Sequence, residues 1–286
     1  MGKLTRVLEK SGYDFDFGSY KEPEAEVKFE LVEGAALGVE PAPAASDDVS
    51  TQYGGRRVIG GVGWDERLKK VVNISSELAE SFRLLRSKIL HPAGGGVPPR
   101  SIMVTSVLPG EGKSFVSANL GIALAQGVDQ HSVLVDCDLR RPSLAKLFGV
   151  SDLLGLADYL LYERELVELI QKTSVENMSI ITCGIPPGNQ AELLGSVRMH
   201  DLVDELTSIY PDRFVVFDTP PLQVASESIV LSQVVDGVIL VVRSGCSSRA
   251  MIERVISDIG AHKILGIIFN GHSPNILTKK YVNKSD

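Results

Sequence analysis

The chain has 286 residues, of which 44% are hydrophobic, and a formal net charge of −7 at pH 7. This size and composition suit one large α/β domain with appendages, and the negative charge argues against general nucleic-acid binding. The most apolar stretch, 229–242, contains Gln233 and Asp236 and is not expected to cross a membrane, and we expect no signal peptide at the N-terminus.

Three cysteines, Cys137, Cys183 and Cys246, lie far apart in the chain, without the spacing of a metal site or of a redox pair. We expect all three to be buried, reduced thiols. Reduced thiols, together with the expected lack of a membrane span and of a signal peptide, predict a cytoplasmic protein.

Residues 1–74 mix acidic residues with Gly, Pro and Ala and hold few apolar clusters. This composition predicts a largely disordered N-terminal tether. Within it, Leu4, Val7 and Leu8 can form the apolar side of a short helix over residues 1–10 that could dock elsewhere.

Residues 75–90 are predicted to form a helix, with a serine cap at the start and a Pro/Gly run after its end. Its apolar residues form one stripe at helical spacing. Glu80, Arg83 and Arg86 follow one another at steps of three on a different face. The pattern alone favours a solvated face with weak ion pairs inside the helix.

Residues 104–114 read Val-Thr-Ser-Val-Leu-Pro-Gly-Glu-Gly-Lys-Ser and predict a phosphate-binding loop between a strand and a helix. Glycines let backbone N–H groups surround phosphate oxygens, and the following helix, expected over 115–126, adds partial positive charge. Lys113 would reach the outer phosphates, and the Ser114 hydroxyl would hold Mg²⁺. Because Val107 stands where the usual pattern has glycine, an ordinary glycine-rich turn is the alternative.

We expect nucleotide contacts from the second half of this loop and the start of the helix. The residues concerned are Pro109, Gly110, Glu111, Gly112, Lys113, Ser114 and Phe115. Their backbone N–H groups and the lysine ammonium are the groups that bind phosphate in such loops.

Two short apolar runs end in carboxylates, the first in Asp136 and Asp138 and the second in Asp218. Buried strands of a parallel sheet have this pattern, and ligands bind at the carboxyl ends of such strands. We therefore expect these carboxylates beside the loop. A strand-end Asp often only caps a helix or a turn, and Asp138 is the one that can cap a segment starting near Ser143.

Helical and extended patterns alternate through the rest of the chain. The sequence predicts helices over 152–172, 191–210 and 248–259, and strands over 178–182, 214–218, 237–242 and 264–269. Repeated βα units predict an α/β fold with a mostly parallel sheet and helices on both faces.

As a set, these motifs resemble the bacterial tyrosine autokinases that control polysaccharide synthesis. Residues 106–114 match the loop of that family, Ala/Ser-x-x-Pro-x-x-Gly-Lys-Ser/Thr, with Pro109 in its place, so the missing first glycine fits. Residues 133–140 are similar to its apolar-Asp-x-Asp-x-Arg motif, and residues 215–220 to its apolar-Asp-Thr/Ser-Pro motif. The resemblance covers about residues 75–275.

The resemblance implies a P-loop NTPase domain over 75–275, between the tether and a flexible tail at 276–286. It also changes the interpretation of the helix at 75–90, since Glu80, Arg83 and Arg86 match the motif through which these kinase domains assemble into rings. Pairing between Glu80 of one subunit and an arginine of the next is then expected.

The resemblance further implies ATP-dependent autophosphorylation on tyrosine with Mg²⁺ as cofactor. Ser114 and Asp218, with Asp136 close by, would hold the metal, and Lys113 would neutralise charge on the phosphates. Asp136 or Asp138 would accept the tyrosine proton, and we favour Asp136 because its strand directs it at the phosphates. Asn270 matches an asparagine that related ATPases use near the adenine.

Outside this core, Arg243 could line the same adenine pocket. Arg140 would contact the substrate or couple the site to a partner. The implied partners are other copies of the chain, protein tyrosine substrates, and a transmembrane activator of exopolysaccharide synthesis or export that recruits the kinase to the inner face of the membrane.

The chain departs from the family at its end, where a cluster of tyrosines is usual and only Tyr281 is present. We expect Tyr281 to be the acceptor, with Tyr13, Tyr20 and Tyr53 as the alternatives. One rival function is a partition or division-site ATPase of the same fold. Such proteins carry a second lysine early in the loop, whereas residues 107–111 of this chain contain none. Another is a catalytically silent scaffold that gates a polysaccharide exporter.

Overall fold

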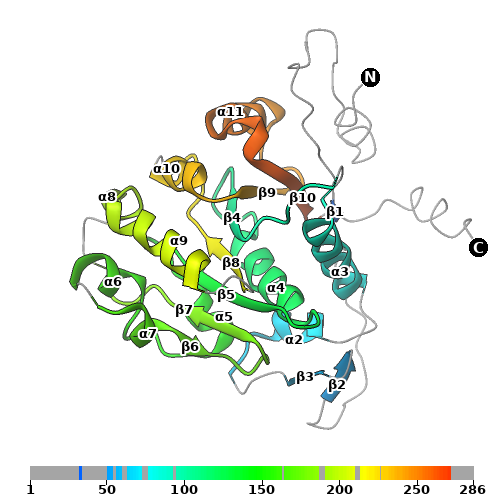
Figure 1. Ribbon diagram of the computed structural model, residues 1–286. Coiled ribbons are helices and arrows are strands. Elements are labelled where there is room, and N and C mark those ends of the chain that lie inside the picture. Colours follow the sequence, from blue (N-terminus) through cyan, green and yellow to red (C-terminus); the bar gives the residue numbers. More distant parts are fainter. Residues whose placement is uncertain are drawn as a thin grey trace, which may run out of the picture.

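The central feature of the computed structural model is an eight-stranded sheet with helices on both faces (Figure 1). The structure describes residues 32–33, 50–53, 56–59, 63–72, 77–92, 95–162, 164–186, 191–209, 213–225 and 227–271. The spatial order of the strands is β1-β10-β9-β4-β8-β5-β7-β6. All neighbouring strands are parallel except β6 and β7, so the predicted mostly parallel sheet is confirmed.

The strands of the sheet begin and end close to where the apolar runs of the sequence do, except for the two-residue edge strands β1 and β6, which follow no such run. The strands are β1 (Val32–Glu33), β4 (Ser101–Ser106), β5 (His131–Asp136), β6 (Gln171–Lys172), β7 (Met178–Ile181), β8 (Arg213–Asp218), β9 (Gly237–Arg243) and β10 (Ile264–Asn270). A separate antiparallel hairpin consists of β2 (Ser50–Tyr53) and β3 (Arg56–Ile59).

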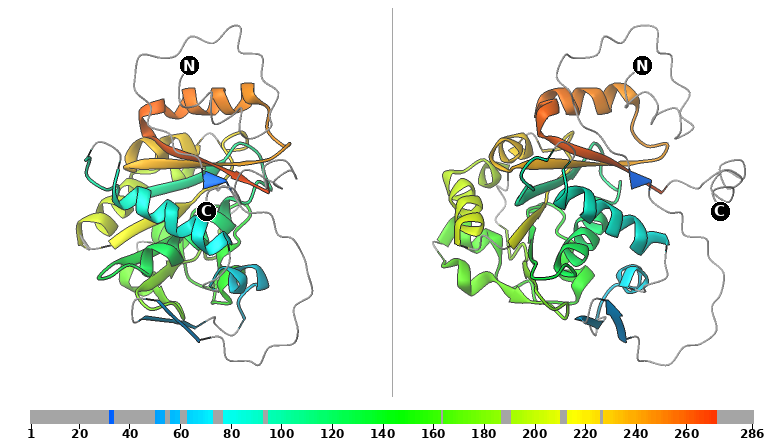
Figure 2. Two further views of the ribbon diagram at one scale, coloured as in Figure 1. Left: turned by 90° about the vertical axis from the view of Figure 1, so that its right-hand side faces the viewer. Right: turned by 45° about the vertical axis from the view of Figure 1, so that its right-hand side comes forward.

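Two layers of helices cover the sheet, as the views in Figure 2 show. One layer comprises α2 (Glu66–Val72), α3 (Glu77–Leu90), α4 (Lys113–Ala125) and α5 (Leu144–Phe148). The other comprises α6 (Leu156–Tyr162), α7 (Leu166–Leu169), α8 (Ala191–Leu194), α9 (Val197–Ile209), α10 (Glu227–Val234) and α11 (Arg249–Ile259).

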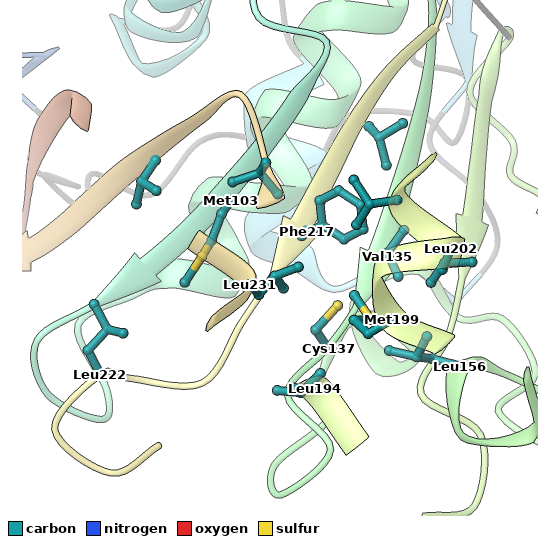
Figure 3. Close-up of a cluster of buried hydrophobic side chains, with 14 of the residues drawn as sticks. Met103, Val135, Cys137, Leu156, Leu194, Met199, Leu202, Phe217, Leu222 and Leu231 are labelled. Carbon is teal, nitrogen blue, oxygen red and sulfur yellow. The ribbon is translucent and has the colours of Figure 1, made fainter. Parts of the chain in front are cut away.

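Alternation along the strands divides the buried side chains between two hydrophobic clusters. In β8, Val215 and Phe217 face the layer of α6 to α11, whereas Phe214 and Val216 face the layer of α2 to α5. Figure 3 shows Phe217 in the first cluster, together with side chains from β4, β5 and several helices. Burial on both faces explains why these strands are continuous apolar runs.

The helix predicted over 152–172 is wrong, because this segment contains α6, α7 and the edge strand β6. Gly155 lies so close to the backbone of residues 182–184 that a Cβ there would collide with it. The N–H of Leu156 donates to the carbonyl of Thr182 at 2.8 Å, which holds the chain at the end of β7 before α6 begins.

The helix predicted over 191–210 is also interrupted, and divides into α8 and α9. Ser196 lies at the break, where its hydroxyl donates to the carbonyl of Leu193 at 2.7 Å. The same hydroxyl oxygen accepts from the N–H of Met199 at 3.3 Å, as an N-terminal cap does.

The packed domain starts before the predicted boundary at residue 75. Trp64 and Leu68 are buried, and the Trp64 ring meets the edge of Phe148 in α5, with ring centroids 5.3 Å apart. The N–H of Asp65 donates to the carbonyl of Leu147 at 3.0 Å. Residues 63–72 are therefore part of the domain, although their composition resembles that of a tether.

Much of the predicted tether, including the helix expected over 1–10, and the whole tail over 276–286 lie outside the described residues. Of the cysteines, Cys137 and Cys183 are buried as predicted, whereas Cys246 is exposed, which corrects that prediction. No helix among the described residues is long and apolar enough to cross a membrane.

Replacing Trp64 by Ala should lower the free energy of unfolding by about 3–5 kcal/mol, because a large buried side chain is lost. Chemical denaturation of the full chain measures this. Val128→Ala is the matched control, since Val128 is 77% exposed and its truncation should change little. A loss below about 1 kcal/mol for Trp64→Ala would mean that residues 63–72 do not belong to the cooperative unit.

Candidate active site

Three neighbouring parallel strands bring the predicted site residues to one edge of the sheet. β8 lies between β4 and β5, and Asp218 is paired in register with Val104 on one side and with Asp136 on the other. The loop that follows β4 and the carboxylates that follow β5 and β8 therefore meet at their common carboxyl end. This convergence is what the sequence pattern predicts.

The loop ends at Gly112, which caps α4 with a φ of 95°, a conformation that favours glycine. A Cβ at Gly112 would also collide with the side-chain amide of Asn270. That amide donates to the carbonyl of Glu111 at 2.8 Å, so the end of β10 is attached to the loop. The N-terminus of α4 thus begins at the site with its partial positive charge directed there.

The carboxylate of Glu111 points into the protein and braces the loop. It is fully buried and accepts from the N–H of Leu108 at 2.8 Å and from the Ser247 hydroxyl at 2.6 Å. It also accepts from the N–H of Arg243 at 3.2 Å. Only the backbone of Glu111 can therefore meet a nucleotide, and nothing in the sequence around Ser247 indicates its contact with the loop.

Lys113 lies at the centre of the charged groups. Its ammonium is 2.7 Å from Asp138 Oδ2 and 3.3 Å from the Ser114 hydroxyl. Burial by itself lowers the pKa of Lys113, but the carboxylates of Asp218 and Asp138 raise it, and the net direction is upward. Lys113 is therefore a cation at the position where the outer phosphates of a nucleotide would lie.

Of the two carboxylate oxygens of Asp218, one accepts a hydrogen bond and the other could bind a metal ion. Its Oδ1 accepts from the Ser117 hydroxyl at 3.0 Å, whereas its buried Oδ2 has no hydrogen-bond partner among the described residues. Burial raises the pKa of Asp218, and Lys113 opposes that rise. Ser117 lies one helical turn after Ser114, a spacing from which its presence at the site could have been predicted.

Asp136 lies beside Asp218 at the strand end, as predicted, but its carboxylate also caps the start of α5. Its Oδ2 accepts from the N–H groups of Ser143 at 3.0 Å and Leu144 at 2.9 Å, and its Oδ1 accepts from that of Asp138 at 3.2 Å. Burial and then the charge of Asp218 raise the pKa of Asp136. The capping role that the sequence left open for Asp138 thus belongs to Asp136.

The oxygen atoms at this edge fit a magnesium ion. Mg²⁺ prefers hard oxygen ligands and in nucleotide sites commonly takes one or two from the protein and the rest from phosphates and water. The Ser114 hydroxyl and the unpartnered Asp218 Oδ2 supply two such oxygens. Asp136 lies behind them, with both oxygens accepting backbone N–H groups.

The remaining predicted residues lie around this centre. Pro109 and Gly110 are exposed at the tip of the loop, and Phe115 is half-buried against the cluster of α2 to α5. The Arg243 guanidinium reaches the carbonyl of Gly110 at 3.4 Å. Arg140 is directed away from the loop, as its guanidinium pairs with a carboxylate at the start of α10 at 2.9 Å.

The charged trio of α3 makes contacts within the chain. Arg83 Nη2 lies 2.8 Å from Glu80 Oε2, an ion pair within the helix of the kind that the pattern alone predicts. Arg86, in contrast, donates to the carbonyl of Ala123 near the end of α4 at 3.0 Å, and its burial lowers the pKa of its guanidinium. Arg86 therefore contributes to packing between helices, which the sequence pattern did not predict.

Comparisons with known proteins identify the family. A family model described as ParA: NUBPL iron-transfer P-loop NTPase matches residues 99–276. Tyrosine-protein kinase YwqD of Bacillus subtilis (strain 168) is 33% identical over 195 residues, which cover 68% of this chain and 81% of that protein.

Two solved structures are similar throughout the domain. The kinase domain of Escherichia coli tyrosine kinase ETK has a TM-score of 0.68 and 32% identity, over 75% of this chain and 83% of that one. The chimerical protein CapA2B2 has a TM-score of 0.66 and 30% identity, over 77% and 96% of the two chains. The chain therefore belongs to the bacterial tyrosine-kinase family of ParA-type P-loop NTPases, as its motifs predict.

Asp136→Ala and Asp136→Asn both remove the charge, but only the amide oxygen of Asn can still accept from the N–H groups at the start of α5. We expect Ala to be less stable than Asn by about 1–2 kcal/mol, the range for losing a helix cap. Denaturation midpoints measure the difference. Equal stability of the two variants would contradict the capping role.

Asp218→Asn should weaken binding of ADP with Mg²⁺ about ten-fold or more, because a negatively charged metal ligand becomes neutral. Without ligand, the variant should be at least as stable as the parent, since an unfavourable buried charge is removed. Calorimetric titration with and without Mg²⁺ tests this. If Mg²⁺ increased the ADP affinity of the variant as much as it does that of the parent protein, Asp218 would be excluded from the metal site.

Proposed function

We propose that this protein is an ATP-dependent protein-tyrosine kinase that phosphorylates tyrosines of its own chain and of its copies. The observation that carries the proposal is the convergence of Lys113, the loop amides and the carboxylates of Asp138 and Asp218 at one sheet edge. Phosphoryl transfer depends mainly on positioning and on neutralising phosphate charge, which this arrangement supplies. The family supports tyrosine as the acceptor.

In this proposal Lys113 exchanges partners when ATP binds. Its ammonium, which pairs with Asp138 in the structure, turns to the outer phosphates and leaves the Asp138 carboxylate free. The amides at the start of α4 bind phosphate oxygens, and the Glu111 brace keeps these amides in position. Asn270 and Arg243, which contact the loop from the ends of β10 and β9, border the nucleoside side.

Ser114 and Asp218 are the residues that would hold Mg²⁺, with Ser117 fixing the orientation of the Asp218 carboxylate. The bound ion supplies neutralisation of the charge on the phosphoryl group during transfer. Asp136 supports the metal site from behind, where it keeps the loop after β5 attached to α5.

The acceptor step forms a bond between the tyrosine oxygen and the γ-phosphorus, while the bond from that phosphorus to the ADP oxygen breaks. The proton of the tyrosine hydroxyl passes to a carboxylate. We assign this proton to Asp138 instead of Asp136, because the Asp136 carboxylate is directed at the backbone N–H groups before α5, whereas Asp138 Oδ2 contacts the lysine that turns to the phosphates. Asp138 Oδ2 is freed once Lys113 turns to the phosphates.

We further propose that the kinase acts in exopolysaccharide synthesis or export, in assemblies of several copies, recruited from the cytoplasm to the membrane by a transmembrane activator. The family membership supports this setting. Glu80 and Arg83 remain the candidates for contacts between copies, because the Glu80 side chain is 70% exposed and the Arg83 side chain, 24% exposed, pairs with it. Arg86 takes part less directly, since it contacts Ala123 within its own chain.

Lys113→Met should abolish both ATP turnover and the formation of phosphotyrosine, because no other side chain of the loop carries positive charge to the outer phosphates. Incubation with ATP and Mg²⁺, followed by detection of phosphotyrosine, measures the effect. Lys172→Met is the control, as this exposed lysine of β6 is remote from the loop and should leave both activities unchanged. Parental turnover in Lys113→Met would overturn the assignment of the loop.

A further inference from the structure

Exposed apolar side chains gather at the edge of the sheet where the active site lies. Leu153 is 73% exposed, Leu154 42% and Ile185 71%. We call these three residues the apolar patch. Large apolar side chains that are exposed together, and not singly, mark surfaces at which another segment of chain binds.

Backbone contacts hold the members of the apolar patch together although they are 30 residues apart in the sequence. The carboxylate of Asp152 accepts from the N–H of Gly184 at 3.0 Å. The backbone of Gly155 lies against that of Gly184, with no room for a Cβ on either. The segments that carry Leu153, Leu154 and Ile185 are therefore fixed side by side.

The apolar patch lies beside the part of the active site that contains Asp138, where we expect the tyrosine to bind. β7 is paired with β5, with Val135 opposite Ile181, so the residues that follow the two strands are neighbours. Leu156, two residues after the patch, and Cys137, between the site carboxylates, belong to one buried cluster (Figure 3). Because β5 and β7 are neighbours, a chain that bound to the patch would lie next to the segment that follows β5, which carries Asp138.

Charged groups of both signs lie near the apolar patch. Arg141 is exposed, and its backbone N–H donates to Asp138 Oδ1 at 3.1 Å, which places it at the rim of the site. The nearby carboxylates of Asp152 and Asp158 each accept a backbone N–H group, at 3.0 Å and 2.8 Å. Arg141 is the cation that could pair with acidic groups of an occupant whose apolar groups face the patch, whereas Asp152 and Asp158 would disfavour acidic groups placed directly beside them.

The sequence contains such a segment. Residues 13–17 read Tyr-Asp-Phe-Asp-Phe. In an extended chain successive side chains point to opposite sides, so the three aromatic rings share one side and the two carboxylates the other. Tyr20, Tyr53 and Tyr281 have no apolar residue two positions further on.

The segment is within reach of the apolar patch. β1 is paired with the carboxyl-terminal part of β10, and Tyr13 precedes Val32 of β1 by 19 residues. Six strand spacings of about 4.8 Å, or roughly 29 Å, separate β1 from β7. The 19 residues from Tyr13 to Val32 can span at most about 65 Å when fully extended, which is more than this separation.

We propose that residues 13–17 bind in extended form to the apolar patch and that Tyr13 is the acceptor of the phosphoryl group. Phe15 and Phe17 pack on Leu153, Leu154 and Ile185, while Asp14 and Asp16 face Arg141. The Tyr13 oxygen bonds to the γ-phosphorus of ATP, ADP leaves, and the phenol proton passes to Asp138. This assignment rests on the proposed kinase function, and it moves the acceptor from Tyr281 to the N-terminal region.

The first test maps phosphotyrosine by mass spectrometry after incubation of the full chain with ATP and Mg²⁺. We expect phosphate on Tyr13, and at least a five-fold loss of it in the double variant Leu153→Ser, Ile185→Ser. Val128→Ser is the control for a remote exposed apolar residue and should be phosphorylated like the parent. Phosphate on Tyr281 but not on Tyr13, or an undiminished Tyr13 signal in the double variant, would overturn the docking proposal while leaving the kinase function intact.

A second test does not depend on catalysis. A peptide of residues 11–19 is titrated into the full chain carrying Phe15→Ser and Phe17→Ser, which disables the chain's own segment. The peptide should bind, and Leu153→Ser with Ile185→Ser should weaken it at least five-fold. Arg141→Glu should weaken it several-fold, and a peptide with Asp14→Arg and Asp16→Arg should recover that loss.

Failure of the peptide to bind, or binding that is indifferent to the apolar patch, would refute the docking. Peptide binding without phosphotyrosine at any position would instead contradict the proposed kinase activity. The two failures are therefore distinguishable.

Discussion

Three buried carboxylates around one lysine are the constraint on which this domain depends. Removing such charges from water is unfavourable unless each is paired or hydrogen-bonded. Here Asp138 pairs with Lys113, Asp136 accepts backbone N–H groups, and Asp218 accepts from Ser117. The parallel register of three strands fixes the spacing, so the fold and the charge cluster support one another.

These contacts do not fully offset the cost of burying the carboxylates, and the remaining cost can be coupled to nucleotide binding. The pKa values of Asp136 and Asp218 are both raised, so the charged forms are disfavoured at these positions. A divalent cation and a polyphosphate that divert Lys113 would redistribute these charges. Binding energy of the nucleotide is then available to exchange the partners of Lys113 and Asp138, which is how we connect nucleotide binding to the acceptor step.

Local sequence patterns predicted the parts that depend on local chemistry. Apolar runs, glycines and strand-end carboxylates placed the sheet, the loop and the aspartates, because strand burial and turn formation are decided over a few residues. The late start of the helix expected at 152–172 could not be predicted, since it follows from the contact of Gly155 with residues 182–184. The same holds for Ser247 and the buried Trp64, whose partners are distant in the sequence. Which aspartate caps α5 depends on the path of the intervening loop.

The most direct test of the account follows the label of the phosphoryl group. The full chain is incubated with Mg²⁺ and with ATP labelled at either the γ- or the α-phosphate, and the protein is then hydrolysed to its amino acids. We expect labelled phosphotyrosine from γ-labelled ATP and none from α-labelled ATP. Release of labelled inorganic phosphate with no label on tyrosine, even with other copies and an activator present, would contradict it and identify an ATPase instead.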